Sequence, residues 1–106
     1  MNKIIEKIQK NLKRISRNNE INLKELYELE RKGAVIIDVR SPQEYNEGHI
    51  DGAILIPEYE IDKKANEILD NKDEILVTYC STGKRSKKAK EKLNKMGYKK
   101  VFILLN

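Results

Sequence analysis

Residues 75–86 read ILVTYCSTGKRS and contain the strongest signal of the architecture in the sequence. The first five of these residues favour a buried β-strand, and Cys80, the only cysteine of the chain, follows them directly. A short loop containing Gly83 then leads into a lysine-rich helical pattern. This strand–loop–helix order is typical of open α/β sheets, which bind ligands at the carboxyl ends of their strands.

The residues that follow Cys80 predict a reactive thiolate. Backbone N–H groups at the start of a helix have no intrahelical partners, and with the helix dipole they favour an anion. Lys84 and Arg85 add full positive charge. Such surroundings lower a cysteine pKa from about 8.5 to about 3.5–7.5, so we expect Cys80 to be ionised at neutral pH. The alternative is a small buried apolar residue that closes a strand, but the glycine and two cations favour the thiolate.

The charge of the chain is distributed unevenly. The formal net charge is +5. Residues 1–20 carry six basic and two acidic side chains. Residues 21–83 carry seven basic and fourteen acidic side chains, and residues 84–106 carry nine basic and one acidic. The positive charge therefore follows Cys80, where it can steer small anions toward the loop. Nucleic acid is a less favoured partner, because no recognition motif or row of stacking aromatic residues accompanies the lysines.

Length and composition predict one cytoplasmic domain. A chain of 106 residues can bury a single core. One cysteine cannot form an intramolecular disulfide, which suits a reducing compartment. The sequence has no run of about 18 apolar residues that could span a membrane, and its N-terminus lacks the apolar core of a secretory signal.

The N-terminal residues 1–17 predict a basic amphipathic helix that ends near Asn18 and Asn19. Its apolar residues recur at helical spacing: Ile4, Ile5, Ile8, Leu12 and Ile15. A membrane-surface or partner-binding helix is one interpretation. We favour a helix packed on the core of its own domain, and divide the chain into an N-terminal helix, residues 1–20, and a domain, residues 21–106.

Helices and strands alternate along the rest of the chain. We expect a helix over 23–32 with Asn22 as N-cap and a short helix that begins at Ser41-Pro42 and ends near Gly48. Two more helices are expected within 58–72 and over 84–96, and strands over 34–39, 53–56, 75–80 and 101–105. The alternation predicts an α/β domain with a mostly parallel sheet flanked by helices.

Four blocks of sequence, read together, resemble the single-domain rhodaneses, a family of sulfurtransferases. They are Ile37-Asp38-Val39-Arg40, Glu44-Tyr45, the run from Gly48-His49-Ile50-Asp51-Gly52-Ala53 to Ile56-Pro57, and Cys80-Ser81-Thr82-Gly83-Lys84-Arg85-Ser86. Gly97-Tyr98-Lys99-Lys100-Val101 is a weaker fifth block. The resemblance covers about residues 21–105 and implies a central parallel sheet flanked by helices.

The resemblance also implies a ping-pong reaction through a persulfide on Cys80. A donor such as thiosulfate or a persulfide gives sulfur to the thiolate, and cyanide or a thiol, which can belong to a protein, removes it. Cys80 is then the nucleophile and sulfur carrier, and Arg85, with Lys84, neutralises the donor. The backbone of Ser81, Thr82, Gly83, Lys84, Arg85 and Ser86 forms the anion cradle. No cofactor is implied, and one cysteine and one histidine do not make a recognised metal site.

One departure from the family concerns the end of the chain. The family continues after the last strand with a glycine pair and a helix, whereas this sequence ends at Asn106. We hypothesise that the helix predicted over 1–17 covers that face of the sheet, from the same chain or a second copy. The oligomeric state is left open.

Three alternatives concern the chemistry of the site. His49 could serve a Cys–His hydrolase, but the resemblance places it in a structural turn. Asp38, Arg40 and Glu44 could form an acid–base set, although we favour a structural corner with an ion pair. Cysteine phosphatases share the strand–loop–helix but need five residues between cysteine and arginine, and only four separate Cys80 from Arg85.

A non-enzymatic module for sulfur relay or protein interaction is the remaining alternative. An intact loop around Cys80 does not distinguish a thiosulfate enzyme from a relay that passes a persulfide to a partner.

Overall fold

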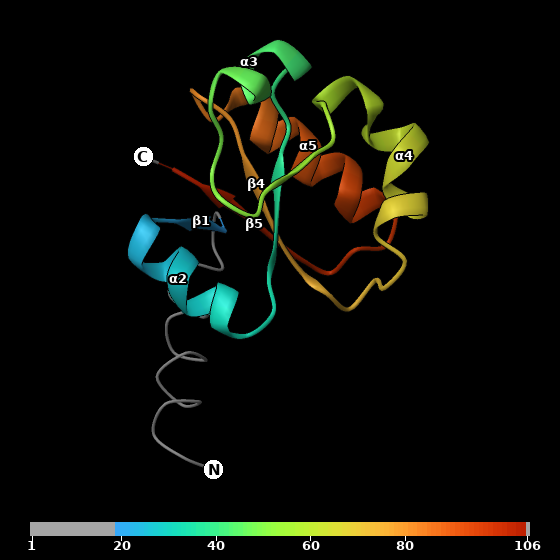
Figure 1. Ribbon diagram of the computed structural model, residues 1–106. Helices are drawn as coiled ribbons and strands as arrows, with labels where there is room; N and C mark the ends of the chain where they lie inside the picture. The colour runs from blue at the N-terminus through green and yellow to red at the C-terminus, as the bar shows by residue number, and fades with distance from the viewer. Residues whose placement is uncertain (1–18, 106) are drawn as a thin grey trace.

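Five parallel strands form one sheet in the computed structural model, which describes residues 19–105 (Figure 1). The strands lie in the order β1 (Glu20–Ile21), β5 (Lys100–Leu104), β4 (Ile75–Tyr79), β2 (Val35–Asp38) and β3 (Ile54–Leu55). Every neighbouring pair is parallel. Because β4 is the central strand, Cys80 follows it at the middle of the carboxyl edge of the sheet.

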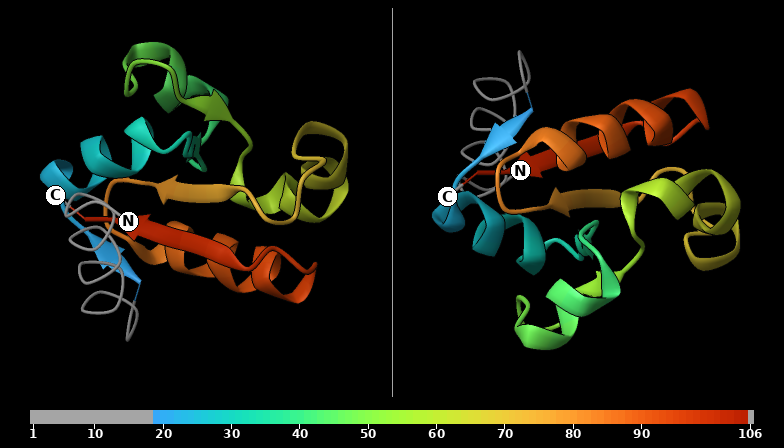
Figure 2. Two further views of the ribbon diagram at one scale, coloured as in Figure 1. Left: turned by 90° about the horizontal axis from the view of Figure 1, so that it is seen from below. Right: turned by 90° about the horizontal axis from the view of Figure 1, so that it is seen from above.

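Helices cover both faces of the sheet, as expected for parallel strands. One core cluster joins strand residues such as Leu76 and Val101 to Ala65 of α4 (Ile61–Ile68) and Leu93 of α5 (Lys84–Lys95). A second cluster on the other face includes Leu26 of α2 (Leu23–Arg31). The two views of Figure 2 show α2 and α5 on opposite sides of β4 and β5. The predicted α/β fold with a parallel sheet is confirmed.

The two predicted helix starts are confirmed by reciprocal capping hydrogen bonds. At α2, the Glu25 N–H donates to Asn22 Oδ1 at 2.9 Å, and the Asn22 N–H donates to Glu25 Oε1 at 3.0 Å. Ser41 and Glu44 form the same box at α3 (Pro42–Glu47), where proline is the first helical residue. This second box holds Glu44 at the carboxyl edge of the sheet.

The helix expected within 58–72 is present as α4, and two features were not predicted. A 3₁₀ turn, η1 (Glu58–Glu60), precedes α4. Strand β1 was not predicted, because two residues are too short to show an alternating pattern. It forms because the backbone of Asn19 and Ile21 accepts hydrogen bonds from Ile103 and Leu105. The other elements lie within two residues of their expected bounds.

Some predictions lie partly outside the described residues. The helix expected over 1–17 and its packing on the sheet belong to this group, so they and the division of the chain at residue 20 stay predictions. Within residues 19–105, none of the helices combines the length and hydropathy required for a membrane span.

Candidate active site

Cys80 lies directly after β4, and its sulfur is enclosed by its own loop. The residue is 2% exposed and belongs to the core cluster beneath α4 and α5. Its Sγ accepts hydrogen bonds from the backbone N–H groups of Gly83, at 3.0 Å, and Ser86, at 3.3 Å. We call residues 80–86 the Cys80 loop. The loop therefore turns N–H donors toward the sulfur, as the sequence predicted.

Gly83 gives the loop its shape. Its φ of +90° lies in the left-handed region, and it is the N-cap of α5. A Cβ built on this residue would lie 3.2 Å from Cδ2 of Leu105, the residue that follows β5. Glycine thus permits both the turn that aims its N–H at Cys80 Sγ and the close approach of the chain after β5.

The surroundings of Cys80 favour its ionised form. Burial raises the pKa of the thiol, but the Ser86 hydroxyl and the backbone N–H groups of Ser86, Gly83 and Thr82 lower it, and together they bring it below its ordinary value. The predicted lowering of the pKa is thus present. Hydroxyl and backbone donors make the largest contributions to it, and Arg85 also interacts electrostatically with Cys80.

The Ser86 side chain is a feature that the sequence analysis missed. Ser86 is fully buried, and its Oγ makes no hydrogen bond of good geometry with any described group. The hydroxyl nevertheless lies close enough to Cys80 to favour the thiolate. A buried hydroxyl without a hydrogen-bond partner is costly. Its position beside Cys80 therefore indicates that it stabilises negative charge on the sulfur.

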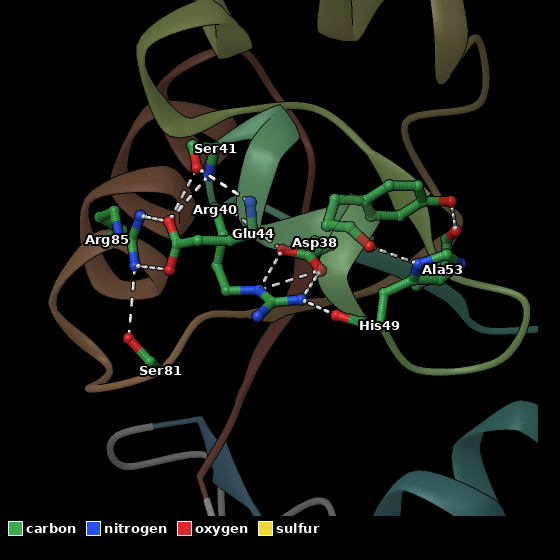
Figure 3. A network of polar contacts seen from close by, with 10 residues as sticks. Asp38, Arg40, Ser41, Glu44, His49, Ala53, Ser81 and Arg85 are labelled. Carbon is green, nitrogen blue, oxygen red and sulfur yellow. Dashed lines mark hydrogen bonds and ion pairs between the residues drawn. The ribbon is translucent and has the colours of Figure 1, made fainter.

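Arg85 lies against Glu44 rather than free in the loop (Figure 3). Its Nη1 donates to Glu44 Oε1 at 2.6 Å, its other Nη donates to Oε2 at 3.0 Å, and the same Nη2 lies 3.3 Å from Ser81 Oγ. Hydrogen bonds from Arg85, and to a smaller extent from Ser41, lower the pKa of Glu44 to about 2. The pair is therefore charged at neutral pH and fastens α5 to α3.

This pairing changes the expected roles of Arg85 and Glu44. Much of the guanidinium charge is offset by Glu44, so Arg85 is less available to neutralise an anionic donor than the sequence suggested. The sequence also grouped Glu44 with Asp38 and Arg40. The sequence gives little indication that Glu44 pairs with Arg85, because 41 positions separate the two residues. Their common place at the carboxyl edges of adjacent strands β2 and β4 is visible only in the fold.

Asp38 and Arg40 form a separate ion pair at the end of β2. Arg40 Nη2 lies 2.8 Å from Oδ2 of the fully buried Asp38 and donates to the Gly48 carbonyl at 2.6 Å. The guanidinium also lies 5.3 Å from the centre of the Tyr79 ring. These contacts tie β2 to the turn after α3, which agrees with the structural role that we favoured.

His49 is engaged with α3 and not with the thiol. Its Nδ1 lies 2.8 Å from the Tyr45 carbonyl oxygen, and its ring stacks on that of Tyr45 with centres 3.7 Å apart. Tyr45 in turn donates its hydroxyl to the Ala53 carbonyl at 2.9 Å. The geometry places His49 in a structural turn and gives no support to a Cys–His hydrolase.

The remaining predicted residues lie on the outer side of the Cys80 loop. Ser81, Thr82 and Lys84 are exposed. Lys84 makes no ion pair with another residue in the range 19–105 and remains a cation beside the loop. The structure thus gathers Cys80, Gly83 and Ser86 around the sulfur, and leaves Lys84 and the Ser81 and Thr82 side chains on the surface.

Comparison with known proteins identifies the family. Residues 22–106 match the model of the rhodanese-like domain. The chain is 40% identical over 65 residues to the thiosulfate sulfurtransferase PspE of Escherichia coli, covering 61% of this chain and 62% of PspE. It is 46% identical over 67 residues to the putative sulfur carrier protein YrkF of Bacillus subtilis, covering 63% of this chain and 35% of YrkF. The chain thus spans less than two thirds of both relatives.

Solved structures give the same answer. A rhodanese with anions from E. coli superposes with a TM-score of 0.63 at 37% identity, covering 66% of this chain and 82% of that one. The human single-domain sulfurtransferase TSTD1 superposes with a TM-score of 0.71 at 27% identity, covering 81% of this chain and 88% of that one. The chain therefore belongs to the rhodanese-like domain family, and the single-domain rhodaneses that its sequence resembles are its relatives.

Proposed function

We propose that this protein is a sulfurtransferase that carries sulfane sulfur as a persulfide on Cys80. The observation that carries the proposal is the thiol itself: its sulfur accepts two backbone hydrogen bonds at the carboxyl end of the central strand, and its pKa is lowered. A sulfur nucleophile must be ionised to attack, and this arrangement favours ionisation.

The first half-reaction loads sulfur from an anionic donor, for which we propose thiosulfate. The Cys80 thiolate attacks the outer sulfur of thiosulfate, a new S–S bond forms on Cys80, and the old S–S bond breaks with its electron pair leaving on sulfite. The persulfide remains anionic. The same N–H donors that favour the thiolate can then support the outer sulfur.

The second half-reaction removes the sulfur. Cyanide or a thiolate attacks the outer persulfide sulfur, and the bond to Cys80 breaks and restores the thiolate. Thiocyanate or a new persulfide leaves. In this proposal Arg85 supports the loop through Glu44. Backbone N–H groups meet the charge of the donor together with Lys84, which forms no ion pair within residues 19–105.

Sulfur relay is the second candidate, favoured by the similarity to a protein named as a putative sulfur carrier. A relay would accept sulfur on the same thiol but pass it to a partner and discharge slowly to cyanide. A phosphatase is less well supported, because Arg85 is held by Glu44 through two hydrogen bonds, in a loop with four residues between it and Cys80.

Turnover with thiosulfate and cyanide tests the proposal. Thiocyanate formation is followed for the wild type and for Cys80→Ser, and we expect steady turnover in the first and none above background in the second. Loading without steady turnover would favour the relay. Equal activity in the two proteins would overturn the assignment of Cys80.

A further inference from the structure

A pocket of about 500 Å³ lies on the outer side of the Cys80 loop. Thr82 and Gly83 of the loop form part of its lining, and Ile103 and Leu105 add apolar surface from β5 and the residue after it. The volume lies in the range of pockets that bind small molecules or short segments of a partner. Of this lining, the proposed sulfur loading uses only the loop backbone and Lys84, and it leaves the other lining residues without a role.

Three lysines of α5 also line the pocket: Lys84, Lys87 and Lys90. We call them the pocket lysines. They recur every three residues, so they form a row along one side of the helix. Within residues 19–105 none of them makes an ion pair, whereas Lys92 on the same helix lies 3.7 Å from a Glu58 carboxylate oxygen and Lys99 lies 3.8 Å from one of Asp73.

The field of the pocket is positive. Glu20 and Glu91 also line it, so the ammonium groups exceed the carboxylates by one. The surrounding sequence adds to this excess, since residues 84–106 carry nine basic side chains and one acidic. Residues 1–19, with six basic side chains and one acidic, have the same sign of charge and do not complement the pocket.

We propose that this pocket docks an acidic segment of a thiol-bearing protein that receives the sulfur from Cys80. The inference rests on the proposed function and names the class of its acceptor. Carboxylates of the segment would meet the pocket lysines, and an apolar side chain would cover Ile103 and Leu105. Charge complementarity of this kind raises association rates and selects partners.

The pocket is placed to couple docking to transfer. Gly83 lines it and also donates its N–H to Cys80 Sγ at 3.0 Å, so an occupant touches the loop that holds the sulfur. In the transfer step the acceptor thiol gives its proton to solvent, and its thiolate attacks the outer persulfide sulfur. The bond to Cys80 breaks, its electron pair returns to Cys80 as thiolate, and the acceptor becomes a persulfide.

Two synthetic peptides of equal length test the proposal. Each contains one cysteine and one leucine, and several aspartates of the first are asparagines in the second. Wild-type protein loaded with thiosulfate is mixed with each peptide, and transfer is followed by mass spectrometry. We expect the acidic peptide to react roughly tenfold faster at low salt, with the advantage shrinking as salt increases.

A matched pair of variants tests whether the pocket lysines cause the preference for the acidic peptide. Lys87→Gln/Lys90→Gln removes two charges from the pocket, and Lys88→Gln/Lys95→Gln removes two charges from α5 outside it. The ratio of the two peptide rates should fall toward one in the first variant and persist in the second. A ratio near one in the wild type, or equal losses in the two variants, would overturn the proposal. Glutathione that reacts as fast as the acidic peptide, with the same lysine dependence, would also overturn it in favour of a small acidic thiol.

Peptide binding separates this inference from the proposed function. Cysteine-free versions of both peptides are titrated into Cys80→Ser, which cannot carry sulfur, and binding is followed by calorimetry. Tighter binding of the acidic version that depends on Lys87 and Lys90 would support the docking site even if thiosulfate failed to load the wild type. Equal binding of the two versions would contradict it.

Discussion

Replacing Gly83 by alanine tests whether the backbone of the Cys80 loop holds the sulfur in its ionised form. The native φ of +90° is unfavourable for alanine, and a left-handed conformation costs a residue with a side chain about 1–2 kcal/mol. The new Cβ would also lie 3.2 Å from Leu105 Cδ2. That atom ends a flexible side chain, so a small shift relieves the contact and the backbone conformation provides most of the cost.

Gly33 provides a matched control for this substitution. It has nearly the same φ, +89°, and a Cβ there would meet nothing within 4 Å. It follows α2, and neither hydrogen bond to Cys80 Sγ comes from it. Gly33→Ala and Gly83→Ala should therefore both lose about 1–2 kcal/mol of unfolding free energy, or about 4–8 °C of melting temperature per kcal/mol for a domain of this size.

Only Gly83→Ala should change the chemistry. Movement of residue 83 toward a relaxed φ weakens the 3.0 Å hydrogen bond from its N–H to Cys80 Sγ, so the thiol pKa should rise. Stability is measured by thermal and urea unfolding, and the thiol pKa by the pH dependence of iodoacetamide alkylation under conditions in which all variants are folded. An unchanged thiol pKa in Gly83→Ala, or an equal change in Gly33→Ala, would refute the role given to the loop backbone.

Two further predictions concern Glu44 and Ser86. The pKa of Glu44 is about 2 in the folded protein, below its ordinary value of 4.5, so its pairing contributes stability above pH 4.5 that is lost as pH falls toward 2. Glu44→Gln should therefore flatten the dependence of stability on pH across that window. Urea unfolding at several pH values measures this dependence. If stability depends on pH as steeply in the variant as in the wild type, the pair of Glu44 with Arg85 is not its cause. Ser86→Ala should raise the thiol pKa of Cys80 without loss of stability, because the hydroxyl has no other partner among the described residues; an unchanged alkylation profile would contradict its proposed action on the sulfur.

The sequence was most informative where structure depends on neighbouring residues. The caps Asn22 and Ser41 act over three positions, so their residue types were enough to place two helix starts. The apolar strand before Cys80 and the glycine after it likewise predicted a thiol at the edge of a parallel sheet. The family resemblance added the persulfide hypothesis and agreed with the parallel sheet.

Features that depend on distant residues escaped prediction. Strand β1 exists only because residues 100–104 lie beside it, and Asn19 donates its side-chain N–H to the Val101 carbonyl at 2.8 Å across 82 positions. The pairing of Glu44 with Arg85 depends on the adjacency of β2 and β4. Ser86 was assigned through its backbone, and nothing in its residue type showed that its hydroxyl would be buried beside the sulfur.

The mass of the protein after incubation with thiosulfate tests the central claim most directly. The account predicts a species heavier by one sulfur atom, located on the peptide that contains Cys80 and removed by cyanide with release of thiocyanate. Cys80→Ser, treated in the same way, should keep its original mass. A wild-type protein that gains no sulfur from thiosulfate or from a small persulfide donor, while its thiol reacts freely with iodoacetamide, would contradict the account.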